Sequence, residues 1–230
     1  MPVVDLLTGS GFGSLLGMRH ALEPDHLAAV STMVSRERSS LRAAWLGVCW
    51  GVGHTVSLVI VGAALILLRT EMPPSMTDVF EFLVALMLVG LGLRAVVLAA
   101  HQGTDGPHTL HSHGAVVHSH ATGASHVHIG DWTLARRPLL IGMVHGLAGS
   151  GALTALVFAA LPTPMARVSY LLLFGLGSTL SMAAMSGLLG WPLARLGSNQ
   201  ALTRTVSIVV GLATMVLGVL WGYEPLFALI

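Results

Sequence analysis

Long apolar stretches separated by short polar segments dominate this chain. A helix needs about 20 mainly apolar residues to cross a bilayer. Six stretches meet this length, and they cover approximately residues 4–33, 43–68, 79–100, 138–161, 167–190 and 204–222. The pattern therefore predicts an all-α integral membrane protein with six transmembrane helices.

The first apolar stretch is longer than a bilayer requires, and it contains ionisable residues on both sides of Pro24. Proline cannot donate the backbone hydrogen bond to the carbonyl four residues earlier, which here belongs to His20. We therefore expect the first helix to be kinked or broken at Pro24. We also expect the His20 carbonyl to be free for a water or an ion.

The composition agrees with a membrane protein and excludes several other classes. Hydrophobic residues make up 54% of the chain and charged residues 9%, against about 25% charged in a soluble domain. The net charge of +1 lacks the basic excess of a nucleic-acid binder. Cys49 is the only cysteine, so a thiolate-rich metal site is excluded, and a bound metal would have nitrogen and oxygen ligands. No basic segment precedes the first apolar run, so we expect no cleaved signal peptide.

The arginines are distributed unevenly over the polar segments. One set of segments holds eight and the other holds only Arg69 and Arg167. The eight are Arg36, Arg38, Arg42, Arg94, Arg136, Arg137, Arg195 and Arg204. By the positive-inside rule, the first set faces the cytoplasm. This predicts a multi-pass protein of the inner (plasma) membrane with both termini outside and the segment 101–137 inside.

Two short motifs recur at nearly one offset along the chain. Residues 17–22 resemble residues 142–147, and residues 51–58 resemble residues 175–182. This suggests two related halves of three helices, 1–100 and 138–230, joined by a loop at 101–137. Because each half has an odd number of helices, the repeat would be inverted. Inverted repeats are typical of transporters, which bind their substrate near the midplane between the halves.

The strongest candidate site lies in the first apolar stretch, where four ionisable side chains occur within seven residues: His20, Glu23, Asp25 and His26. A charged group at bilayer depth costs at least about 2.5–3.5 kcal/mol, so it normally faces a partner or a polar pathway. A divalent cation would be such a partner. The alternative is a cytoplasmic helix end with merely solvated side chains.

Two further histidines are candidate ligands in the other apolar stretches. His54 lies among small and hydroxyl residues, and His145 is the apparent repeat counterpart of His20. A lone membrane histidine is more often a packing residue, but the ionisable group of the first stretch favours a ligand role for His54. His145 could be a ligand, a gate or a relic of duplication.

Eight of the 12 histidines lie in the segment 101–137, which is rich in Gly, Ser and Thr and is predicted to be a flexible loop. They are His101, His108, His111, His113, His118, His120, His126 and His128. Clustered imidazoles in a flexible chain bind ions such as nickel, copper and zinc without a fixed geometry. We expect an accessory metal-binding loop that raises supply and does not form the translocation site. The alternative is a solvated linker.

These motifs resemble those of the nickel/cobalt transporter family. Residues 20–26 resemble its HxxxxDH signature, residues 53–57 its second-helix motif, and residues 174–179 its later FGLGxxT segment. The similarity covers most of the chain and is greatest to the shorter six-helix branch associated with urease accessory transporters.

The resemblance implies that His20, Asp25 and His26 are essential for metal selection and that His54 takes part. It also implies that cytoplasmic metal chaperones or metalloenzyme maturation proteins are partners. The chain departs from the longer members, because Ser178 and Met182 occupy a region that holds acidic residues there.

The favoured function is uptake of Ni²⁺ or Co²⁺ through a His/Asp site near the midplane, with efflux as the alternative. Mixed imidazole and carboxylate ligation does not exclude zinc. No nucleotide-binding loop and no HExxH motif occurs, so neither a self-contained ATP-driven pump nor a metalloprotease is expected, and the protein is not expected to be an enzyme. A membrane haem protein with His54 and His145 as axial ligands is a third possibility, although it leaves Glu23 and Asp25 unexplained.

Overall fold

The computed structural model describes residues 12–35, 37, 39–68, 70, 72–101, 110–113, 116–119, 126–129, 132–148, 161, 163–196 and 199–229. A helical segment at residues 12–20 precedes the labelled helices. These are α2 (Pro24–Val34), α3 (Ser40–Leu68), α4 (Pro74–Ala100), α5 (Arg136–Ala148), α7 (Pro164–Leu196) and α8 (Gln200–Ala228).

Four of the helices are long and apolar enough to cross a membrane, judged by length and composition. They are Ser40–Leu68, Pro74–Ala100, Met165–Leu193 and Gln200–Ala228. This agrees with the prediction of a helical membrane protein. In the described part of the chain, the other two predicted spans contain shorter helices. The first predicted span contains the segment 12–20 and α2, and the fourth contains α5.

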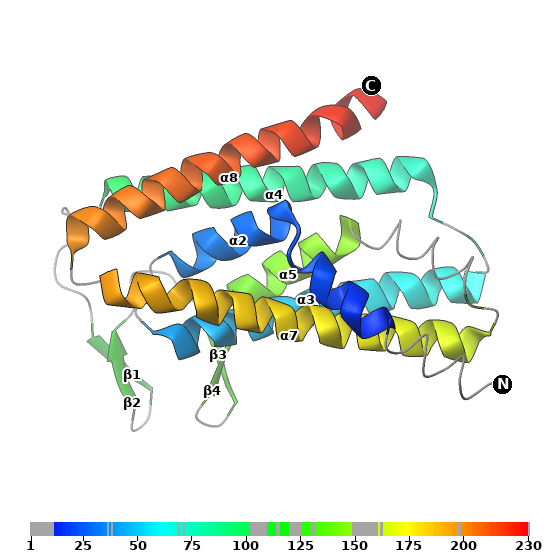
Figure 1. Cartoon of the computed structure of the whole chain (residues 1–230), viewed down its shortest axis with the longest axis horizontal. Coiled ribbons are helices and arrows are strands. Elements are labelled where there is room, and N and C mark those ends of the chain that lie inside the picture. Colours follow the sequence, from blue (N-terminus) through cyan, green and yellow to red (C-terminus); the bar gives the residue numbers. More distant parts are fainter. Residues whose placement is uncertain are drawn as a thin grey trace.

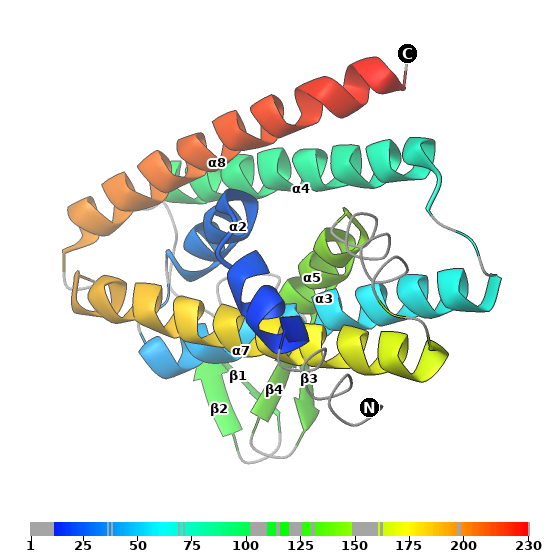
Figure 2. The ribbon, with the colours of Figure 1, turned by 45° about the vertical axis from the view of Figure 1, so that its right-hand side comes forward.

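The long helices form two pairs with the short helices between them (Figure 1). Helices α4 and α8 lie side by side, α3 packs against α7, and α2 and α5 lie between the pairs. The turned view of Figure 2 shows the same order and places the segment 12–20 against α7. Small residues permit this packing, since a β carbon at Gly51 would lie 2.7 Å from the Thr179 Cα.

The first apolar stretch is broken at Pro24, as predicted. The helix of residues 12–20 ends in a turn, and α2 begins with Pro24 at its first position, where the missing N–H is not needed. The expectation of a free His20 carbonyl is wrong. The turn is tight enough for this oxygen to accept a hydrogen bond from the Glu23 backbone N–H at 3.0 Å.

The His-rich segment contains two short antiparallel hairpins, which the sequence analysis did not predict. Strand β1 (Leu110–His113) pairs with β2 (Val116–Ser119), and β3 (His126–Ile129) pairs with β4 (Trp132–Ala135). In each hairpin two residues separate the strands, and one of the two is a glycine. This spacing is a hairpin signal that composition alone does not reveal.

Candidate metal site

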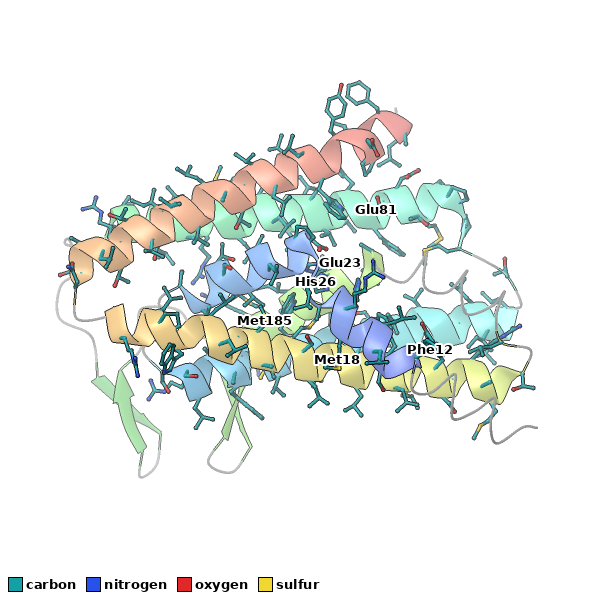
Figure 3. The ribbon with its side chains drawn as sticks, in the orientation of Figure 1. Phe12, Met18, Glu23, His26, Glu81 and Met185 are labelled. Atoms are coloured by element: carbon teal, nitrogen blue, oxygen red, sulfur yellow. The ribbon has the colours of Figure 1, made fainter. Side chains whose placement is uncertain are left out.

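Five ionisable side chains meet near the middle of the helical bundle. His20 ends the segment 12–20, Asp25 and His26 lie in the first turn of α2, and His145 lies near the end of α5. His54 lies 14 residues from either end of α3, since 54 − 40 and 68 − 54 are both 14. Figure 3 places Glu23 and His26 about midway along the long helices.

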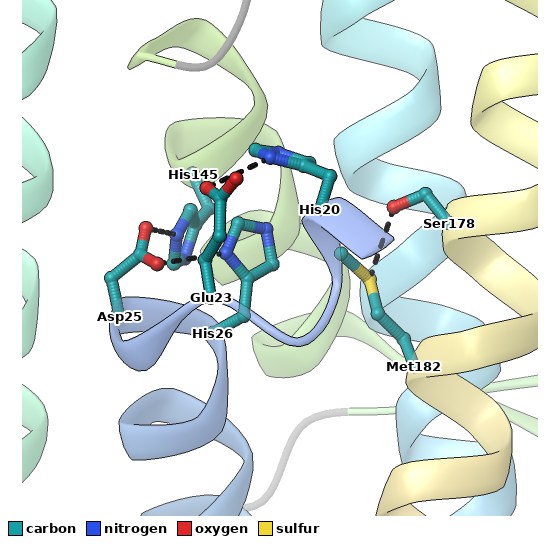
Figure 4. Close-up of polar contacts among 7 residues, drawn as sticks. All are labelled: His20, Glu23, Asp25, His26, His145, Ser178 and Met182. Carbon is teal, nitrogen blue, oxygen red and sulfur yellow. Dashed lines mark hydrogen bonds and ion pairs between the residues drawn. The ribbon is translucent and has the colours of Figure 1, made fainter. Parts of the chain in front are cut away.

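The Asp25 carboxylate links two imidazoles. His145 Nε2 lies 2.7 Å from Asp25 Oδ2, and His26 Nδ1 lies 3.1 Å from Asp25 Oδ1 (Figure 4). All three residues are buried, with exposed fractions of 6% for Asp25, 1% for His26 and 2% for His145. A buried carboxylate needs such donors, because leaving it without partners would cost several kcal/mol.

His20 and Glu23 form a second ion pair at the edge of the cluster. His20 Nδ1 lies 2.9 Å from Glu23 Oε2. The His20 side chain is 12% exposed and the Glu23 side chain 48% exposed. Glu23 therefore lies beside the cluster and is open to the surroundings.

Three imidazoles gather at the centre of the cluster. The His20 ring centroid lies 4.4 Å from that of His26 and 5.4 Å from that of His54, and His26 and His54 are 5.5 Å apart. Among the described residues, His20 Nε2, His26 Nε2, both His54 nitrogens and His145 Nδ1 are buried without a hydrogen-bond partner. Unpartnered buried nitrogens are rare in folded proteins unless they serve a ligand.

Two overlapping groups therefore have the composition and spacing to hold a metal ion. One consists of His20, His26 and His54, and the other of Asp25, His26 and His145. In each group, one ligand atom from every residue lies within 4.8 Å of those from the others. His26 belongs to both groups.

Glycines let α5 approach α3 closely enough to complete this cluster. A β carbon at Gly142 would overlap the Trp50 carbonyl oxygen, and one at Gly146 would overlap the His54 carbonyl oxygen. The two backbones are therefore in direct contact on either side of His145. This contact brings His145 to Asp25, which is 120 residues away in the sequence.

Comparison with known proteins places this arrangement in a family. The chain is 32% identical over 226 residues to the urease accessory protein UreH of Bacillus sp. (strain TB-90), which covers 97% of this chain and 94% of that protein. The chain belongs to the urease accessory protein UreH family. This agrees with the urease-accessory family type that the sequence motifs indicated. An accessory protein is not a catalytic enzyme, as the sequence predicted.

The UreH-family chain is also similar to two plant proteins. It is 29% and 27% identical to the chloroplast proteins FOR GROWTH AND FERTILITY 1 and 2 of Arabidopsis thaliana, over 80% and 81% of this chain. It spans only 50% and 48% of their length. No protein-family model and no solved structure matches the chain significantly.

The structure does not bring every candidate residue of this UreH-family protein into the cluster. Among the described residues, Glu23 reaches the cluster through its ion pair with His20. His101 follows α4, and its Nδ1 lies 2.8 Å from the Val97 carbonyl oxygen, so it caps that helix. His108 and His120 lie outside the described residues. For His111, His113, His118, His126 and His128 the structure describes the backbone only.

Two aromatic residues at the site were missed by the sequence analysis. Trp50 is fully buried, and its ring centroid lies 5.4 Å from that of His26 and 5.5 Å from that of His145. The ring centroid of Phe174 lies 5.4 Å from that of His20. Trp50 could have been found, because it precedes His54 by four residues and so shares its helix face. These rings cover the imidazoles with apolar surface.

Proposed function

We propose that this protein transports a divalent transition-metal ion, Ni²⁺ or Co²⁺, into the cell through the cluster of His20, Asp25, His26, His54 and His145. The observation that carries the proposal is that four of these groups are buried and His20 is nearly so among membrane-length helices, with imidazole nitrogens that have no partner among the described residues. A membrane protein gains nothing from such a costly cluster unless an ion or proton uses it.

The ligand chemistry suits a borderline metal ion. Imidazole binds nickel, cobalt and zinc well, whereas magnesium prefers oxygen ligands and Cu(I) prefers sulfur. Relationship to a urease accessory protein supports a role linked to the nickel supply of urease, and the transporter-like motifs support nickel as the transported ion. A cytoplasmic metal chaperone or maturation protein would then receive the ion.

Matched contacts support an inverted repeat of two three-helix halves. Gly17 packs on the Phe174 carbonyl, and Gly142 packs on the Trp50 carbonyl. The position offsets are 125 residues for the glycines (142 − 17) and 124 for the aromatic residues (174 − 50). Thr55 and Thr179, also 124 residues apart, hydrogen-bond to each other at 3.1 Å. A pair that contacts its own counterpart is expected at the axis of such a repeat.

The two halves imply a topology with six spans. The segment 12–20 and α2 would belong to the first span, and α5 would belong to the fourth. The start of α3, the end of α4, the end of α7 and the start of α8 lie at one end of the bundle in Figure 1. That end carries most of the arginines, which supports a cytoplasmic location for it and for the segment 101–137. Both termini would then lie outside.

A haem between His54 and His145 is disfavoured by the third imidazole. The His26 centroid lies 4.0 Å from that of His145 and 5.5 Å from that of His54, whereas His54 and His145 are 6.4 Å apart. The His26 ring therefore occupies space that a porphyrin between these residues would need. Efflux remains the alternative to uptake.

Radioactive nickel uptake by cells that express the protein tests the proposal, with an empty vector as the baseline. The variant Asp25→Asn removes the central charge at nearly constant size, and it should lower the uptake rate by at least about tenfold, which corresponds to loss of one buried charge-assisted interaction of about 1.4 kcal/mol or more. Asp78→Asn makes the same change near the start of α4 and should keep the parental rate. Parental uptake by a correctly inserted Asp25→Asn protein would reject the site, and loss of preloaded nickel would indicate efflux.

A further inference from the structure

We propose that three imidazoles, those of His20, His26 and His54, bind the ion, and that the carboxylates of Glu23 and Asp25 orient two of these imidazoles and do not bind the ion themselves. The inference rests on the proposed transport function and assigns the ligands within its site. It replaces the sequence-based expectation that the carboxylates are ligands.

The two ring nitrogens of His26 have different surroundings. Nδ1 lies 3.1 Å from Asp25 Oδ1. An ionised carboxylate only accepts hydrogen bonds, so Nδ1 carries the proton and Nε2 keeps its lone pair. Nε2 is buried and has no partner among the described residues. Its lone pair is therefore available to an ion shared with His20 and His54.

His20 repeats this arrangement. Its Nδ1 lies 2.9 Å from Glu23 Oε2, and its Nε2 is buried without a partner in the described part of the chain. Histidines that bind metals nearly always donate their other ring N–H to a carboxylate, a carbonyl or a water, which fixes the tautomer and the ring orientation. The hydrogen bonds of His20 and His26 already have this form (Figure 4).

The charges of the two carboxylates match this assignment. Three neutral imidazoles leave the charge of a divalent ion uncompensated in a buried site, whereas one negative charge each on Glu23 and Asp25 brings the formal sum to zero. The Asp25 side chain is 8% exposed and that of Glu23 is 48% exposed. The better enclosed charge is less screened by its surroundings, so Asp25 contributes more to ion binding than Glu23 does.

His145 belongs to the supporting residues. Its Nε2 donates to Asp25 Oδ2 at 2.7 Å, so each Asp25 oxygen already accepts one imidazole N–H. An ion bound directly to Asp25 would have to share these oxygens with the two imidazoles. The His145 Nδ1 is also buried without a partner among the described residues, but the His145 ring centroid lies 6.4 Å from that of His54 and His145 is not part of the three-imidazole group. His145 therefore fixes Asp25, which in turn fixes His26.

X-ray absorption spectroscopy of bound Co²⁺ tests the assignment, because multiple scattering from the rings counts the imidazoles on the metal. The full chain is used, with the seven histidines of residues 108–128 changed to Gln so that the core is left to bind cobalt, and with His101 kept because its Nδ1 caps α4. The seven are His108, His111, His113, His118, His120, His126 and His128. The parent should show three imidazoles on each cobalt.

Two matched histidine variants and two carboxylate variants then separate ligands from supports. His54→Gln should lower the count to two, whereas His145→Gln should leave it at three. Asp25→Asn should also keep three imidazoles while weakening Co²⁺ binding by about 10–100-fold, the usual effect of losing an orienting partner. Glu23→Gln should keep the count with a smaller loss of affinity.

The opposite pattern would overturn the assignment and leave transport intact. If His145→Gln lowers the imidazole count while His54→Gln does not, the ion occupies the group of Asp25, His26 and His145. Loss of an oxygen ligand from the metal in Asp25→Asn would have the same meaning. A parent that binds no cobalt in its core would instead reject the proposed function, and the inference with it.

Discussion

Replacing Gly142 with alanine tests whether the contact between α5 and α3 positions the site without altering any ionisable group. The added Cβ would overlap the Trp50 carbonyl oxygen and lie 2.9 Å from the carbonyl carbon. Gly90→Ala is the matched control, since Gly90 is also in a helix interior but a β carbon added there would have no atom within 4 Å.

The magnitude follows from these distances. Ordinary contacts of a β carbon begin at 3.4 Å, so α5 must move by at least about 0.5 Å (3.4 − 2.9). His145 lies three residues further on the same helix face. A shift of about 0.5 Å along its 2.7 Å bond to Asp25 is enough to lengthen that bond to about 3.2 Å, beyond the usual length of a charge-assisted bond. Overpacking costs about 1–3 kcal/mol and the weakened bond up to about 1.5–3 kcal/mol.

Thermal unfolding and Co²⁺ binding in detergent measure the two consequences. At about 2–4 °C per kcal/mol for a chain of this length, the overpacking cost of about 1–3 kcal/mol should lower the Tm of Gly142→Ala by about 2–12 °C. Its Co²⁺ affinity should fall by about tenfold or more, which corresponds to 1.4 kcal/mol. Gly90→Ala should match the parent in both measurements. If Gly142→Ala also matched the parent, the backbone contact would not be what positions His145.

Two further predictions concern the loop and the topology. Deleting residues 108–128 should preserve nickel uptake at high external metal and weaken it at scarce metal, whereas His20→Ala should abolish uptake at both; the reverse result would exchange the roles of loop and core. After replacement of Cys49, an impermeant maleimide should label Thr163→Cys in intact cells but not Ser119→Cys, and the opposite pattern would invert the proposed orientation.

The sequence was sufficient to predict the helical membrane character and the break at Pro24, because both depend on local features. Apolar length identifies a spanning helix wherever it packs, and proline ends a helix through its own missing N–H. His20, Asp25 and His26 could be singled out for the same reason, since their burial cost follows from the apolar residues around them.

Contacts between distant helices could not be predicted in this way. The bond between Asp25 and His145 depends on Gly142 and Gly146 bringing α5 against α3, and nothing in the residues next to His145 reveals its partner. The prediction of a free His20 carbonyl was wrong for a similar reason. Pro24 removes one donor, but the turn supplies the Glu23 N–H in its place.

The break at Pro24 explains why the ionisable residues occur in this order. Unsatisfied N–H groups and the helix dipole favour anions at the start of a helix and cations at its end. Glu23 and Asp25 lie at the start of α2, whereas His20 lies at the end of the segment 12–20. A continuous helix would offer neither advantage at this depth. The break therefore lowers the cost of placing the buried Asp25 and the partly exposed Glu23 at this depth, and it favours positive charge beside His20, where the proposed ion binds.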